Sequence, residues 1–248
     1  MKKIIQWFLV KTGNLILKSF DLLVDVFVSP NAVFDMKDTK LLKLLEDNID
    51  FIQKEYQAIF DNNQLNNIED FYKVDTEIGQ DENWKSFPFK LYNNSFEKNL
   101  LLCPNINRLL QSIPSCTSAM ISVLCPGKYI SPHKGLYKGI IRCLFTIEVP
   151  SEGAVWIVID GKRYDFQRGK AIFFDETYLH EVKNEADGNR VALYLDIYRQ
   201  LPFPLNLLNR IVFNLLKNSF FITQKVKGYS EISNSRIINQ QKLVGYQF

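Results

Sequence analysis

Three segments of the sequence alternate apolar and polar side chains, and this alternation constrains the fold more than any other feature of the chain. The segments are residues 118–125, 140–149 and 190–198. Successive side chains of a β-strand point to opposite faces of a sheet, so residues two apart share a face. In each segment one of the two faces is apolar throughout. We therefore expect strands of one sheet whose dry face is covered by other parts of the chain.

The opposite face of these segments carries polar side chains. Ser122 lies in the first segment, Arg142 in the second, and Arg190 and Asp196 in the third. Two guanidinium groups and a hydroxyl suit a small dicarboxylate, because arginine holds a carboxylate with two parallel hydrogen bonds. A plain alternative for Arg142 is a salt bridge with Glu148 or Asp196. The shared polar face favours the anion site over that alternative.

The chain has only two histidines, His133 and His180, and both lie in strand-rich sequence. Each is followed by an arginine of the polar face, Arg142 and Arg190 respectively. Neutral imidazole is a good ligand for iron, zinc and copper, although a single histidine is more often structural or solvated. The residues alone leave open whether the two imidazoles share a metal or have separate structural roles.

The other elements fit a domain that is mainly β with flanking helices. With 46% apolar residues in 248, the chain can bury a full core. Apolar side chains recur at helical spacing over residues 40–60, which predicts a helix covering the dry face, and a short helix is expected at residues 105–111. Residues 154–166 predict a hairpin closed by an Asp160-Gly161 turn. Consecutive antiparallel strands with short turns are what a jelly roll requires.

The run from about Trp84 to Arg199 resembles the aspartyl/asparaginyl β-hydroxylase family of Fe(II)- and 2-oxoglutarate-dependent dioxygenases. The matching pieces are "FPFKLYNN", "LLCPNINRLLQSIPSCTSAMISVLCPGKYISPHKG", "YKGIIR", "IFFDETYLHEVKN" and "RVALYLDIYR". The resemblance implies a double-stranded β-helix, or jelly roll, with Fe(II), 2-oxoglutarate and O2 as its cofactors. Within the family, "HKGLYKGIIR" and "DIYRQLPFPLNLLNR" look most like the branch that hydroxylates the acyl chains of lipid A.

The resemblance also implies roles for the residues of the polar face and for the two histidines. His133 and His180 match the iron ligands, and these two are the catalytic pair. Arg190 and Ser122 match the pair that holds the distal carboxylate of 2-oxoglutarate. Arg142 matches a residue near the metal-binding end of that cosubstrate.

Four further positions qualify this expected site. Gly135 stands where many other 2-oxoglutarate oxygenases have a carboxylate as third ligand, so we expect two protein ligands with water in the gap. Leu144 replaces a histidine that commonly contacts the cosubstrate in the family, which predicts weaker or different binding there. Asp175 and Glu176 precede the second histidine, and we expect them to have turn or supporting roles rather than to bind the metal.

The resemblance favours a hydroxylase that acts on a C–H bond of a lipid acyl chain of the lipid A type. The alternative is hydroxylation of an aspartyl or asparaginyl side chain in a peptide, or of a free amino acid. A non-enzymatic binding module is disfavoured by the complete set of two histidines and an arginine. A halogenase with chloride in the gap at Gly135 ranks low, because family members share this gap without halogenating.

The chain divides into three parts by composition. Residues 1–35 are an apolar segment interrupted by charges, with Gly13 as an expected break, residues 36–200 form the dioxygenase domain, and residues 201–248 are basic and apolar. We expect neither end to span a bilayer, and docking on the core and peripheral membrane contact are equally open for the first segment.

Charge is distributed unevenly along the chain. From Arg199 to Phe248 there are seven basic residues and one acidic residue, so this part carries +6; the total of +3 leaves −3 for the remainder. This asymmetry favours an anionic membrane surface over nucleic acid, for which no motif is present. The four cysteines lack C-x-x-C spacing and no cleavable signal peptide is evident. We therefore expect reduced thiols and a cytoplasmic location, at the inner face of the membrane if the ends bind lipid.

Overall fold

The computed structural model describes residues 2–36, 39–68, 83–220 and 222–231, and of residues 2–11 the backbone only. Its helices are α1 (Lys2–Phe27), α2 (Lys40–Asp47), α3 (Ile49–Asp61), α4 (Glu97–Leu102), α5 (Pro104–Gln111) and α6 (Leu205–Lys217), and residues 222–231 are also helical. Its strands are β1 (Val33–Phe34), β2 (Asn66–Asn67), β3 (Trp84–Leu91), β4 (Asn94–Ser95), β5 (Cys116–Leu124), β6 (Tyr129–His133), β7 (Ile140–Glu148), β8 (Val155–Ile159), β9 (Lys162–Asp165), β10 (Ala171–Phe174), β11 (His180–Asn184) and β12 (Arg190–Tyr198).

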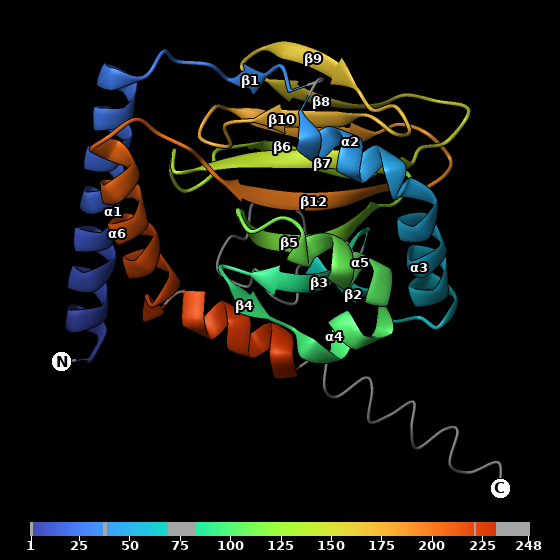
Figure 1. The fold of residues 1–248 in the computed structure, drawn as a ribbon, viewed down its shortest axis with the longest axis horizontal. Coiled ribbons are helices and arrows are strands. Elements are labelled where there is room, and N and C mark those ends of the chain that lie inside the picture. Colours follow the sequence, from blue (N-terminus) through green and yellow to red (C-terminus); the bar gives the residue numbers. More distant parts are fainter. Residues whose placement is uncertain (1, 37–38, 69–82, 221, 232–248) are drawn as a thin grey trace, which may run out of the picture.

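The strands form two antiparallel sheets stacked in layers (Figure 1). The larger sheet has the order β1-β10-β7-β12-β5-β3-β2, with β4 paired to β3, and the smaller sheet has the order β6-β11-β8-β9. Apart from the consecutive pairs β8-β9, β3-β4 and β2-β3, neighbours in each sheet come from distant parts of the sequence, as in a jelly roll. The expected fold, mainly β with flanking helices around a jelly-roll core, is confirmed.

The outer face of the larger sheet is the dry face expected from the alternation. Ile121, Phe145 and Leu193 are fully buried in one cluster with side chains of α2, α3 and α5. The helix expected over residues 40–60 is two helices that meet at Asn48, whose side-chain amide donates to the Leu44 carbonyl at 2.9 Å. Such a local bond competes with the helical pattern and explains the division.

The inner face of the larger sheet faces the smaller sheet. A second cluster joins Leu124 and Leu144 of the larger sheet to Ile157, Ile159 and Val182 of the smaller one. Ser122 and Arg142 lie on this inner face, because each is two residues before a buried leucine of its own strand, Leu124 and Leu144 respectively. Arg190 lies on the same face, because it is the register partner of Leu124. The space between the sheets therefore contains the predicted site.

Helices α1 and α6 lie side by side at one flank of the sheets (Figure 1). Phe20 and Val24 of α1 pack with Phe213 and Leu216 of α6 in a third apolar cluster. The break expected at Gly13 is absent, because α1 runs through it, and an interior helical glycine costs only about 1 kcal/mol relative to alanine. Within the described ranges, no helix is both long enough and apolar enough to cross a membrane.

One expectation falls partly outside the described residues, because the basic C-terminal part includes residues 232–248. The Asp160-Gly161 turn is confirmed: both residues have positive φ, 50° and 76°, between β8 and β9. The four cysteines are free thiols.

Candidate active site

The two histidines lie opposite each other on neighbouring strands of the smaller sheet. His133 ends β6, His180 begins β11, and the two are direct partners in the strand register. Their ring centroids are 4.1 Å apart. Two imidazoles that bind one metal with N–metal bonds of about 2.1 Å, at about 90 to 110° to each other, have ring centroids roughly 4.6 to 5.3 Å apart, so the pair lies within about half an ångström of the spacing for a shared ion. A register irregularity follows His180, and such irregularities often aim a side chain at a site.

The backbone orients both imidazoles in the same way. The Nδ1 atom of His133 lies 2.8 Å from the Ser131 carbonyl oxygen, and Nδ1 of His180 lies 2.9 Å from that of Tyr178. A carbonyl only accepts, so each Nδ1 carries the proton and the Nε2 lone pair is directed elsewhere. Burial, and then the neighbouring His133, lower the pKa of His180 to about 3. His180 is therefore neutral at physiological pH, which is the state that binds a metal.

Arg190 lies at the other end of the inner face and is 2% exposed. Among the described residues its Nε and Nη1 atoms have no hydrogen-bond partner, and its guanidinium carbon lies 4.8 Å from the centre of the Phe166 ring. Burial lowers the pKa of this guanidinium to about 10, so it remains charged near neutral pH. A buried cation without a counter-ion is costly, and this one is suited to bind an anion.

A row of small side chains crosses four strands beside Arg190. Ser86, Ser122, Ala192 and Thr146 are successive register partners on β3, β5, β12 and β7. The Oγ atom of Ser122 accepts from Nε1 of Trp84 at 3.1 Å, which leaves its own proton to donate. The hydroxyls of Ser86 and Thr146 are buried without a partner. These unpartnered polar atoms and Arg190 together suit one carboxylate.

The sequence reasoning did not include Ser86, Thr146 or Trp84. The alternation could have identified Thr146, because it lies two and four residues after Leu144 and Arg142 on the same strand. For Ser86 and Trp84 the strand register had to be known.

Arg142 lies nearer the histidines than Arg190 does. It is the register partner of Phe174, whose ring lies 5.1 Å from that of His180. Its Nε atom donates to Oδ1 of Asp196 at 3.0 Å, and its Nη2 atom forms an ion pair with Glu176. The salt bridge with Asp196 that the sequence left open is therefore formed.

Glu176 lies four residues before His180 and is buried against the segment that follows His133. Its Oε1 atom accepts from the backbone N–H of Leu136 at 3.1 Å, and its backbone carbonyl accepts from Gly135 N–H at 2.7 Å. Burial raises the pKa of Glu176 to about 7, against the attraction of Arg142. Within the described part of the chain, no three His, Cys, Asp or Glu side chains form a group that could hold a metal.

Comparison with known proteins assigns the chain to a family. The model of the aspartyl/asparaginyl beta-hydroxylase family matches residues 46–200, which is more than half of the chain. The chain belongs to this family. All strands of the two sheets except β1, both histidines and both arginines lie within the matched residues.

Three relatives show the range of this hydroxylase family. The ornithine lipid ester-linked acyl 2-hydroxylase of Rhizobium tropici is 31% identical over 189 residues, covering 73% of this chain and 67% of the relative. The aspartate beta-hydroxylase domain-containing protein 2 of Rattus norvegicus is 29% identical, covering 63% and 47%. The aspartyl/asparaginyl beta-hydroxylase of Homo sapiens is 25% identical, covering 64% and 21%, so this chain spans less than half the length of the last two.

The family fold also has distant structural neighbours. A prolyl-4-hydroxylase from Pseudomonas putida superimposes with a TM-score of 0.40 at 15% identity, covering 63% of this chain and 88% of that chain.

Position 144 is where this family member departs from the pattern implied by the resemblance. Leu144 is buried in the apolar cluster between the sheets, and its register partners are Tyr194 and Ile172. The side chain therefore adds an apolar wall at a place where family members commonly have a histidine.

A largely buried ion network connects the candidate site to α1. Asp175 Oδ2 lies 3.0 Å from Nη1 of Arg199 and 3.4 Å from Nζ of Lys138. The same Lys138 Nζ lies 3.2 Å from Asp25 of α1, and the Lys138 N–H donates to Asp21 of α1 at 2.7 Å. Burial raises the pKa of Asp21 to about 6. Asp175 therefore has a structural role, and α1 is attached to the loop that follows His133.

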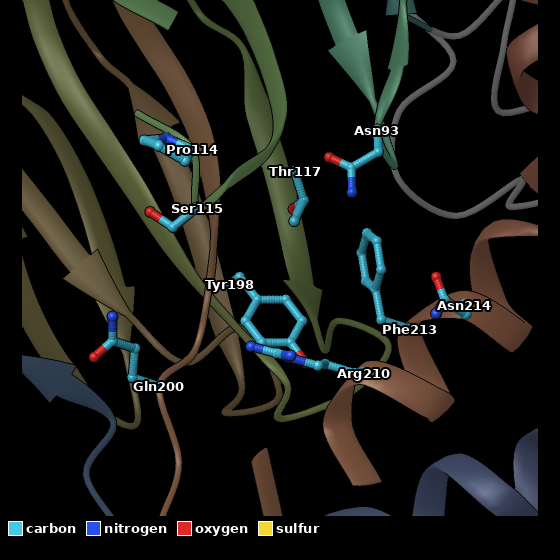
Figure 2. A pocket seen from close by; sticks show the side chains of 9 residues that line it. All are labelled: Asn93, Pro114, Ser115, Thr117, Tyr198, Gln200, Arg210, Phe213 and Asn214. Carbon is cyan, nitrogen blue, oxygen red and sulfur yellow. The ribbon is translucent and has the colours of Figure 1, made fainter. Parts of the chain in front are cut away.

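A pocket of about 310 Å³ lies between α6 and the ends of β5 and β12 (Figure 2). Arg210 and Phe213 of α6 face Tyr198 across it. None of the five predicted site residues lines this pocket, so it is separate from the space between the sheets.

Proposed function

We propose that this family member is an Fe(II)- and 2-oxoglutarate-dependent dioxygenase that hydroxylates a C–H bond. The observation that carries the proposal is the presence, in the space between the two sheets, of two neighbouring imidazoles held at Nδ1 by backbone carbonyls and of a buried guanidinium without a partner among the described residues. The first arrangement suits a metal ion and the second suits a carboxylate. A cosubstrate with a metal-chelating end and a distal carboxylate requires both.

Each residue has one task in this proposal. His133 and His180 hold Fe(II), Arg190 and Ser122 hold the distal carboxylate of 2-oxoglutarate, and Arg142 lies beside its metal-binding end. Bound iron and 2-oxoglutarate would supply the oxygen chemistry with O2. The chain's own residues orient these groups and exclude water through the apolar cluster between the sheets.

The favoured substrate is the acyl chain of a lipid. The Rhizobium relative, an acyl 2-hydroxylase, supports this choice. Two exposed leucines also support it, because Leu136 and Leu179 lie in the segments that carry His133 and His180 and are 39% and 49% exposed. An acyl chain that passes over these side chains would cover apolar surface as it approaches the metal.

Peripheral contact with an anionic membrane belongs to the same proposal. Both α1 and α6 expose large apolar side chains beside the faces that pack on the domain: Leu15, Ile16, Leu22, Leu23, Val26 and Phe27 on α1, and Leu207, Leu208, Ile211 and Leu215 on α6. Large exposed apolar patches mark interaction sites, and helices of this kind lie in the membrane interface. The basic C-terminal part of the chain would add attraction to acidic lipid. Because α1 is also attached to the loop after His133, this surface would place the site near the bilayer.

The test of the activity is the conversion of 2-oxoglutarate to succinate by the Fe(II)-loaded protein, with panels of acyl lipids and of Asp- or Asn-containing peptides. Stimulation by lipids is expected. Stimulation by peptides alone would replace the lipid substrate with the peptide alternative, and no succinate under any condition would contradict the dioxygenase.

The test of the membrane contact is co-sedimentation with vesicles that contain phosphatidylglycerol. Leu22→Asp with Ile211→Asp should release the protein, whereas Leu101→Asp, at a leucine on α4 that is 78% exposed, is the matched control. Retention of the double variant, or loss of a dimer instead of loss of vesicle binding, would contradict the membrane surface.

A further inference from the structure

The space beside Gly135 is filled by another residue of the chain. A Cβ atom added at Gly135 would lie 2.1 Å from Cδ, 2.3 Å from Cγ and 2.5 Å from Oε1 of Glu176. The backbones of the two residues are joined by the 2.7 Å hydrogen bond from Gly135 N–H, so they cannot separate without losing it. Any side chain at position 135 therefore has to displace the carboxyl group of Glu176.

Glu176 is held in this space from two sides. Its carboxyl group accepts from Leu136 N–H and forms the ion pair with Arg142, and the residue is only 3% exposed. Among the described residues it does not join the two histidines in a group of three metal-binding side chains. Glu176 therefore occupies the place of a side chain at position 135 without completing a ligand set.

We propose that the Glu176 side chain fills the space that a metal-binding side chain at position 135 would need, without binding the metal itself. The Gly135–Glu176 pair thereby limits the number of protein ligands to two. The part that concerns ligand number rests on the proposed function, whereas the steric pairing does not.

The simpler role for Glu176 is that of a counter-ion for Arg142 alone. That role requires charge but does not require Gly at position 135. The steric role requires glycine at position 135 but does not require a charge on Glu176, so variants at position 135 distinguish the two roles.

A thermal double-mutant cycle tests the steric pairing in the metal-free, full-length protein. Gly135→Ala should lower the Tm of the wild type by at least about 4 °C, and by less than half as much when Glu176→Ala has made room. Gly13→Ala is the matched control, because a Cβ at Gly13 has no neighbour within 4 Å, and its effect should be the same in both backgrounds. Equal losses from Gly135→Ala in the two backgrounds would overturn the pairing.

Calorimetric titration with Co(II) tests the ligand number. Gly135→Asp alone should bind Co(II) no more tightly than the wild type, because Glu176 leaves no room for the new carboxylate. Gly135→Asp combined with Glu176→Ala should bind at least about tenfold more tightly than Glu176→Ala alone. Tighter binding by Gly135→Asp alone would overturn the inference. A wild type that binds no Co(II) would refute the proposed metal site, whereas the thermal cycle would still decide the pairing.

Discussion

Arg142 and Arg190 lie on the same face of the same sheet, yet their surroundings are opposite. Arg142 has Asp196 and Glu176 as ion-pair partners and the Tyr194 ring 4.5 Å from its guanidinium carbon. Arg190 is more deeply buried, and within the part of the chain that the structure describes it has no ion-pair partner and two nitrogen atoms without a hydrogen bond. One arginine is neutralised by the protein itself, and the other is left for something else to neutralise.

This difference separates two tasks, metal binding and anion binding, within the space between the two sheets. Buried charges are costly unless paired, so the unpaired guanidinium lowers stability until an anion binds. The end with Arg142 and the histidines is organised by the protein's own charges before any ligand arrives. The end with Arg190 is organised for a ligand, and ligand binding should therefore stabilise the protein.

The largest expected effect concerns the metal end of the site, which contains His133 and His180. His133→Ala and His180→Ala should each lower Co(II) affinity and succinate formation at least about 100-fold, because neither remaining imidazole can hold the ion alone. Calorimetry and a succinate assay measure these losses. Tyr129→Phe, on the same strand as His133 but on the surface, is the control that should retain both properties. Unchanged Co(II) affinity in either histidine variant would contradict the assignment of His133 and His180 as the metal ligands.

The next effect is on stability and contrasts the two arginines directly. Arg142→Met should destabilise the ligand-free protein by about 3 to 5 kcal/mol, because it leaves two buried carboxyl groups without their partner. Arg190→Met should be neutral or stabilising, because it removes a buried charge that has no partner. Urea unfolding of both variants measures the contrast. Equal destabilisation would mean that Arg190 has an internal role similar to that of Arg142.

Cosubstrate affinity should show the reverse order. Arg190→Met should weaken 2-oxoglutarate binding by about 2 to 5 kcal/mol, the typical loss for one partner of a buried charge pair. Arg190→Lys keeps the charge but not the two parallel hydrogen bonds, so its affinity should lie between those of Arg190→Met and the wild type. Calorimetry with the metal-loaded proteins measures this. Unchanged affinity in Arg190→Met would contradict the assignment of the distal carboxylate.

The smallest expected effect is a pH dependence at the metal end. The folded-state pKa of Glu176, about 7, lies above its ordinary value of 4.5, so the folded protein holds this proton more tightly than the unfolded chain does. The resulting stabilisation is fully present below pH 4.5 and is lost as the pH rises through 7, with a total on the order of 3 kcal/mol.

Glu176→Gln removes this titration and keeps the shape of the side chain. The difference in unfolding free energy between wild type and Glu176→Gln, measured in urea from pH 4.5 to 8, should therefore change with pH in the stated direction. Subtraction cancels Asp21 and His180, which are present in both proteins. A difference that is constant with pH would show that Glu176 is already ionised at low pH.

Part of the site could be predicted from local sequence alone. The alternation placed Ser122, Arg142 and Arg190 on one face, because the side-chain period of two follows from the geometry of a single strand. A different local rule, the preference of Asp-Gly for tight hairpin turns, predicted the Asp160-Gly161 hairpin. The family motifs identified His133 and His180 as a pair, and the structure places their rings 4.1 Å apart; their binding of iron remains a prediction.

The helical regions show where local rules stop. Gly13 does not interrupt α1, because the helix is held by its packing on α6 and not by its own propensity. Asn48 divides the predicted helix over residues 40–60 by bonding to the carbonyl of Leu44. The first outcome depends on tertiary packing, and the second depends on a local side-chain hydrogen bond that apolar periodicity does not contain.

The sequence by itself determined which residues share a face, which turns close hairpins and which family motifs are present. Only the tertiary structure decided which polar groups on that face pair with each other. Arg142 and Asp196 are 54 residues apart, and Trp84 and Ser122 are 38 residues apart. Glu176 reaches the space beside Gly135 from another strand connection altogether. Such contacts depend on strand register and on how the two sheets stack, and the periodicity of a single strand contains neither.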